Sequence, residues 1–140
     1  MRTIKFRGKR IDKDELVFGD LLTGMGYKKG KFYILPHLTH YPSDCNSLDG
    51  YEVETDTVGQ FTGLYDKDGK EIYEGDIIIS EELKHTCHYV RYMESEAMFV
   101  AMIIGSPLDE YCGIRQSWIH KFSKKIIGNI HDNPELLTNK

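Results

Sequence analysis

The chain has 140 residues, a formal net charge of -4 and a hydrophobic fraction of 40%. This length fits one ordinary domain or two very small ones, and the apolar content excludes a disordered chain. The longest apolar run, residues 97–104, is far shorter than the roughly 20 residues of a membrane-spanning helix. The N-terminus lacks the apolar segment of a secretory signal, and three cysteines, an odd number, favour reduced thiols. We therefore expect a cytoplasmic protein.

The first part of the chain predicts short strands joined by turns. Ile4 opens a stretch in which apolar and charged residues alternate, as is typical of a half-buried strand, and an Asp-rich turn leads to strand-like residues 16–22. Residues 31–35 resume the strand pattern. Residues 36–50 form a predicted loop that is longer than compact domains usually contain, so we expect it to be functional or partly disordered. We therefore predict an N-terminal β-hairpin segment over residues 1–56.

The second part of the chain has a clearer strand pattern. Asp66-Lys67-Asp68-Gly69 is a hairpin turn signal, and we expect Gly69 to hold a positive φ, which glycine adopts without steric cost. Asn133 followed by Pro134 predicts a short helical turn near the C-terminus. Strands are predicted over residues 51–55, 58–64, 72–73, 77–79, 85–93, 97–104 and 125–130.

Several blocks of the chain resemble a known family. The sequence TVGQFTGLYDKDGKEIYEGDII stands at residues 57–78, and IIGNIHDNPELL stands at residues 126–137. Together with residues 4–8 and 18–21, these blocks resemble the YopX-like family of phage and prophage proteins. The resemblance implies a mainly β fold with a small SH3-type barrel over residues 57–140, and an origin in a mobile element of a bacterium. The resemblance does not indicate which catalytic or binding role, if any, the chain has.

Basic residues are concentrated near the N-terminus. Residues 1–31 hold nine Lys or Arg against four acids, so they carry +5 while the rest of the chain carries -9. One interpretation is contact with nucleic-acid phosphates. The alternative, which we favour, is a solvated strand face that meets acidic residues of the same fold or of a neighbour.

The charge pattern also suggests how copies of the chain associate. Lys5, Arg7 and Arg10 alternate with apolar residues, which predicts an N-terminal edge strand that presents cations outward. An acidic stripe in residues 52–56 alternates in the same way. Pairing of the edge with this stripe between copies predicts a homo-oligomer, in which exposed aromatic residues supply most of the affinity.

The segment His85-Thr86-Cys87-His88 is the one cluster with metal-binding residue types. On a strand, His85 and Cys87 share one face while His88 points the other way, and zinc needs about four ligands, or three and water. No phosphate-binding loop, dinucleotide fingerprint or zinc-protease motif occurs. We therefore predict no metal, no cofactor and no enzymatic activity.

The aromatic residues give the remaining functional signal. Trp118 stands among polar neighbours, so it either joins an exposed aromatic patch or plugs one end of the barrel, and we favour the second interpretation. We predict a non-catalytic β-barrel interaction module that forms a homo-oligomer or docks a phage or host protein. The alternative is a nucleic-acid-associated protein that uses its basic N-terminal segment. The predicted interaction surface comprises Arg7, Arg10, Tyr65, Tyr73 and Trp118.

Overall fold

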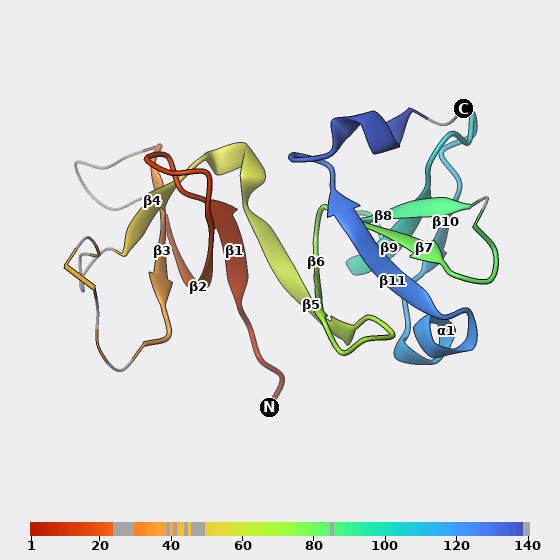
Figure 1. Ribbon diagram of the computed structural model, residues 1–140, viewed down its shortest axis with the longest axis horizontal. Coiled ribbons are helices and arrows are strands. Elements are labelled where there is room, and N and C mark those ends of the chain that lie inside the picture. Colours follow the sequence, from red (N-terminus) through yellow and green to blue (C-terminus); the bar gives the residue numbers. More distant parts are fainter. Residues whose placement is uncertain are drawn as a thin grey trace. The chain divides into compact units, whose positions relative to one another are not determined.

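The structure is a computed structural model. It describes residues 1–23, 30–38, 40, 42–43, 45, 50–84 and 86–138, so the predicted loop over residues 36–50 lies partly outside the described residues. The chain divides into two compact units, residues 1–61 and 62–140, and the boundary falls within strand β5 (Gly59–Tyr65) (Figure 1).

The first unit is an antiparallel sheet in the order β4-β3-β2-β1-β5. Val17, Ile34 and Val53 form its buried core because each lies on the inward face of its strand. A single 3-10 turn over Thr55–Thr57 leads from β4 into β5. The strands that precede β5 are β1 (Phe6–Lys9), β2 (Leu16–Thr23), β3 (Phe32–Pro36) and β4 (Tyr51–Val53).

The prediction of an N-terminal edge strand with outward cations is wrong. β1 lies inside the sheet, between β2 and β5, so both of its edges have neighbours. The Arg7 and Arg10 side chains are buried, with exposed fractions of 7% and 3%, whereas Ile4 and Ile11 are exposed. The two arginines that alternation assigned to solvent are therefore buried, on both faces of the strand, while Phe6 packs against the core as expected. Edge-to-stripe pairing between copies loses its structural basis.

The second unit contains a five-stranded antiparallel sheet in the order β10-β9-β8-β7-β11. Within this unit, the end of β5 forms a hairpin with β6 (Glu71–Tyr73). The buried core consists of Ile72, Ile78, Val90 and Ile119. The strands of the sheet are β7 (Asp76–Ser80), β8 (Cys87–Met93), β9 (Met98–Ile103), β10 (Tyr111–Gly113) and β11 (Lys124–Asn129).

The turn between β5 and β6 is organised by the buried carboxylate of Asp66. One oxygen accepts the backbone N–H groups of Asp68 and Lys70, each at 2.9 Å, and the other accepts that of Ile126 in β11 at 3.1 Å. Gly69 has φ 83°, which confirms the predicted positive φ. Since β11 is the last strand of its sheet, this turn covers an edge that would otherwise expose backbone donors.

A short helix, α1 (Gln116–Lys121), lies just before β11 in the second unit (Figure 1). The sequence did not predict it, although Ile119 of α1 enters the core. The mainly β fold and the 3-10 turn at Pro134–Leu137 are confirmed. The described strands form two open sheets, so the SH3-type barrel is not confirmed. In the described part of the chain, no helix is long and apolar enough to cross a membrane.

Candidate functional site

A cavity of about 270 Å³ lies beside α1, and we call it the α1 pocket. It forms where the chain leaves β10, turns into the helix and ends it. Two aromatic rings, two cations and one hydroxyl group are therefore contributed by a segment of only ten residues. The lining residues are Gly113, Arg115, Ser117, Trp118, Lys121 and Phe122.

The α1 pocket is positively charged. No carboxylate is among its lining residues, and Arg115 and Lys121 form no ion pair with any acid that the structure describes. Both side chains are exposed. The surrounding sequence has the same bias, because residues 111–131 contain four Lys or Arg and no Asp or Glu. A chain with net negative charge thus places at this pocket two cations, Arg115 and Lys121, that form no ion pair with the described residues.

Trp118 is held in the α1 pocket by two buried side chains. The Lys124 ammonium lies 4.6 Å from the centroid of the indole ring, a cation–π contact, and the His88 ring meets the indole edge to face at 5.4 Å. Lys124 and His88 are 4% and 5% exposed. The ring is therefore fixed from the interior while it also lines the pocket, which gives a ligand a preorganised surface.

Burial also sets the protonation of the groups behind Trp118. Desolvation, followed by the nearby positive charge of Lys124, lowers the pKa of His88 to about 4. Desolvation likewise lowers the pKa of Lys124 below its usual value. His88 is therefore neutral at pH 7, and its Nδ1 atom is buried without a hydrogen-bond partner among the described residues. These groups support the indole ring and leave the positive charge of the pocket to Arg115 and Lys121.

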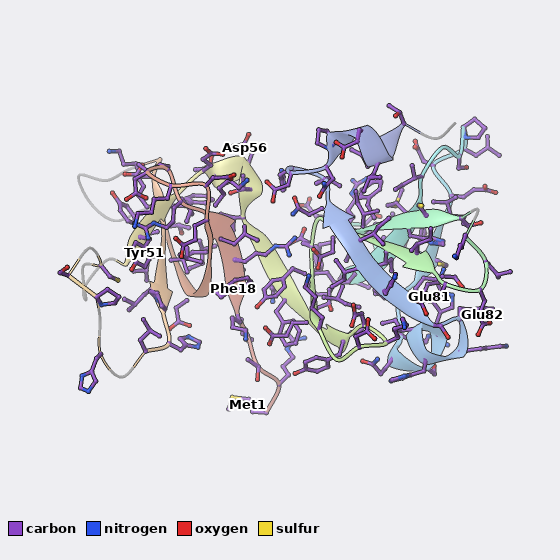
Figure 2. The ribbon with its side chains drawn as sticks, in the orientation of Figure 1. Met1, Phe18, Tyr51, Asp56, Glu81 and Glu82 are labelled. Atoms are coloured by element: carbon purple, nitrogen blue, oxygen red, sulfur yellow. The ribbon has the colours of Figure 1, made fainter. Side chains whose placement is uncertain are left out.

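A larger cavity, of about 470 Å³, lies at the end of β7, and we call it the β7 pocket. Its lining includes Glu81, Lys84 and Lys125. Glu81, labelled in Figure 2, follows β7. Its carboxylate forms ion pairs with Lys67 at 2.8 Å and with Lys125 at 3.1 Å, which lower its pKa. The charges of this pocket are thus largely matched within the chain, so it is a weaker candidate than the α1 pocket.

Three residues of the predicted interaction surface are buried. Arg10 donates two hydrogen bonds to the carboxylate of Asp12, at 2.9 and 2.8 Å, and its guanidinium lies 4.0 Å from the ring centroid of Tyr51. Arg7 is similarly buried in the first unit. Tyr73 is 1% exposed and donates its hydroxyl proton to Glu71 at 3.2 Å. These side chains stabilise the fold and do not form an accessible surface.

The other two predicted residues belong to the second unit and lie near α1. Tyr65 is 44% exposed, and its backbone exchanges hydrogen bonds with the side-chain amide of Gln116, at 3.0 and 2.7 Å. Gln116 belongs to α1, so this amide ties the end of β5 to the helix that carries Trp118. The structure therefore brings Tyr65 and Trp118 to the same helix, and their role in binding stays a prediction.

The predicted metal-type cluster is only partly visible, because His85 lies outside the described residues. Within the described ranges, no group of three or more His, Cys, Asp or Glu side chains is placed to hold a metal ion. Burial raises the pKa of the Cys87 and Cys112 thiols, whereas a nucleophilic cysteine needs a lowered pKa. The absence of a metal stays a prediction that elemental analysis of the purified protein tests.

Sequence reasoning missed most of the α1 pocket. It selected Trp118 but not Arg115, Lys121 or Phe122, which line the same cavity. The sequence did contain a signal for this pocket, because residues 111–131 include basic and aromatic residues but no acid. The concentration of charge in residues 1–31 pointed instead to Arg7 and Arg10, which the fold buries.

The fold of the chain is found in a solved structure. The crystal structure of protein EF1440 from Enterococcus faecalis is similar over 99% of this chain and 100% of that chain, with a TM-score of 0.66 and 24% sequence identity. At this identity, the similarity shows the fold alone. No curated protein matches the chain.

The paired β-sheet units and short helix define a mainly β protein whose candidate site is a basic, aromatic pocket. The family model described as YopX protein matches residues 5–138 of the chain. The chain therefore belongs to the YopX family, which confirms the family expected from the blocks at residues 57–78 and 126–137.

Proposed function

We propose that this chain is a non-catalytic interaction module that binds an anionic partner through the α1 pocket. One observation carries the proposal: Arg115 and Lys121, without carboxylate partners among the described residues, flank an indole ring fixed from the interior. Exposed cationic side chains that form no ion pair with the described residues can pair with an external anion. An origin in a phage or prophage, supported by the resemblance to YopX-like proteins, is part of the proposal.

The partner classes expected from the sequence fit this pocket differently. A phage or host protein would present an acidic segment, and a nucleic acid would present phosphates; both supply the negative charge that the pocket lacks. A second copy of the chain is supported less, because the outward cations on which edge-to-stripe pairing depended are buried. If the partner is a nucleic acid, we propose that it binds the segment around α1 and not the N-terminal segment.

Trp118 is the only tryptophan of the chain, so its fluorescence reports directly on the α1 pocket. The experiment adds polyglutamate, polyphosphate and a single-stranded oligonucleotide separately, at low salt, to the wild type and to Arg115→Ser/Lys121→Ser. We expect at least one polyanion to change the emission of the wild type but not that of the variant. If none of them binds the wild type, the proposed function is wrong.

A matched control separates the pocket from general charge. Arg91→Ser/Lys70→Ser removes one arginine and one lysine, both exposed and outside the α1 pocket, so it changes the net charge by the same amount. We expect this control to bind as the wild type does. If both double variants lost the same affinity for the polyanion, binding would depend on overall charge, and this result would contradict the α1 pocket as the binding site.

A further inference from the structure

We propose, resting on the proposed function, that the anionic partner of the α1 pocket is single-stranded nucleic acid. The pocket combines aromatic rings with cations, whereas an acidic peptide requires only the cations. Proteins that bind single strands without sequence preference use this combination, because each base stacks on an aromatic ring while basic side chains neutralise the backbone. Trp118 and Phe122 supply the rings, and Arg115 and Lys121 supply the charge.

The spacing along α1 fits a nucleotide. Arg115 stands three residues before Trp118 and Lys121 stands three residues after it. A rise of about 1.5 Å per residue separates the Cα atoms of Arg115 and Lys121 by about 9 Å along the axis, with Trp118 midway between them in sequence. Each base within a strand is likewise followed and preceded by a phosphate. A base on Trp118 therefore places its two flanking phosphates toward the two cations, and the Ser117 hydroxyl is available to a phosphate or sugar oxygen.

The size of the pocket favours part of a polymer over a complete small molecule. Pockets for small molecules usually measure roughly 300–1,000 Å³ and enclose most of the ligand. The α1 pocket is smaller, about 270 Å³, and its cationic side chains are exposed. Such a pocket holds one unit of a chain whose remainder runs over the surface. A base within a duplex is stacked and paired already, so the proposal requires an unpaired strand.

The support behind Trp118 also matters to stacking. Lys124 and His88 are both buried and both contact the indole ring, at 4.6 Å and 5.4 Å between the groups. A ring that is already fixed loses little conformational entropy when a base stacks on it.

The test measures binding of a fluorescein-labelled oligothymidylate of about 16 nucleotides, a length within the range that single-strand-binding folds cover. Anisotropy gives the affinity at about 50 mM and about 200 mM salt, and Trp118 emission reports stacking. Two phosphate contacts predict that the wild type loses about sevenfold in affinity across this range. We expect stacking to quench the emission, and we expect Arg115→Ser/Lys121→Ser to make the salt slope less negative by about 1.4. Arg91→Ser/Lys70→Ser should keep the wild-type slope.

Failure of this inference differs from failure of the proposed function. If polyglutamate quenches Trp118 and the oligonucleotide does not bind, the α1 pocket binds an acidic protein segment and the nucleic-acid inference is wrong. If a duplex of the same sequence binds as tightly as the single strand, without quenching, stacking is absent and the inference is also wrong. Loss of all binding by every polyanion contradicts the proposed function itself.

Discussion

Arg10 in the first unit and Arg115 in the second have opposite surroundings, although both stand in basic stretches. Arg10 is buried, donates two hydrogen bonds to Asp12 and stacks on Tyr51. Arg115 is exposed, lines a pocket and has no carboxylate partner among the residues that the structure describes. The first arginine has its partners within the fold, and the second has room for a partner outside it.

This difference shows what a count of charges misses. The N-terminal stretch is the more basic of the two by sequence, yet the structure buries Arg7 and Arg10 and pairs Lys9 with Asp14 at 2.8 Å. The stretch around α1 has fewer cations but contains no acid. Charge that is matched within the chain contributes to folding, whereas unmatched charge remains available for binding.

The largest expected effect concerns Asp66, a carboxylate whose partners all lie within the chain. Asp66→Ala leaves three backbone donors, those of Asp68, Lys70 and Ile126, without their acceptor and uncovers the edge of β11. We expect the free energy of unfolding of the second unit to fall by about 3 kcal/mol, because hydrogen bonds to charged groups contribute strongly when buried. Denaturant unfolding followed by Trp118 fluorescence measures this unit.

Asp68→Ala is the matched control for Asp66→Ala. Asp68 belongs to the same turn, but its side chain is exposed and, among the described residues, is paired only with Lys67, at 3.5 Å. We expect a change within about 0.5 kcal/mol, as exposed ion pairs contribute little. A similar loss in both variants would mean that the turn as a whole, rather than the Asp66 carboxylate, sets the stability.

The second effect is an acid-dependent loss of stability that arises at His88. Its pKa is about 4 in the folded chain, against 6.5 for an unperturbed histidine. Between these two pH values the unfolded chain binds a proton that the folded chain does not, so stability falls as the pH falls from about 6.5 through about 4. The full shift corresponds to roughly 3 kcal/mol, of which about 2 kcal/mol is expected to be lost by pH 5. Urea unfolding at a series of pH values, monitored at Trp118, measures it.

His88→Phe isolates this contribution, because phenylalanine keeps a ring against Trp118 but binds no proton. We expect the variant to lose less stability than the wild type between pH 7 and pH 5. At neutral pH it should be at least as stable, since it removes a buried Nδ1 atom without a hydrogen-bond partner. Identical pH profiles for the two proteins would show that other groups dominate the acid response.

Local patterns were sufficient to predict much of the fold. Alternation located most of the strands, and the Asp-Lys-Asp-Gly turn gave the positive φ of Gly69. The sequence did not predict helix α1, because the helix has only six residues and begins after Arg115, without a side-chain cap. Such a helix owes its stability to packing, here through Ile119 and Trp118, and packing is not visible in a local pattern.

The candidate site was less predictable for a similar reason. Alternation shows that the two faces of a strand differ, but it does not show which face the sheet buries. Arg10, just after β1, is buried because Asp12 and Tyr51 receive its guanidinium, and Tyr51 stands far away in sequence. Arg7, on the opposite face of the strand, is buried as well. Proximity of Asp12 to Arg10 in the chain was the available clue. The α1 pocket required the path of the chain from β10 to β11, which only the structure supplies.

Arg10→Ser measures the folding role of the matched arginine. The substitution removes two hydrogen bonds to Asp12 and the contact with Tyr51, and leaves a space in the first unit. We expect the free energy of unfolding of this unit to decrease by about 2 kcal/mol, the range for loss of a buried, hydrogen-bonded charge. The first unit contains no tryptophan, so hydrogen exchange of the β1 and β2 amides is used to measure its stability. Unchanged protection factors would contradict a structural role for Arg10.

The smallest expected effect completes the comparison and concerns the unmatched cations. Arg115→Ser and Lys121→Ser remove exposed side chains that form no ion pair with the described residues, so neither should change the unfolding free energy of the second unit by more than about 0.5 kcal/mol. Urea unfolding monitored at Trp118 measures both, and unaltered emission of the native state shows that the α1 pocket is intact. A loss as large as that from Arg10→Ser would mean that these cations stabilise the fold, and weaker polyanion binding by the double variant could then not be assigned to a lost contact.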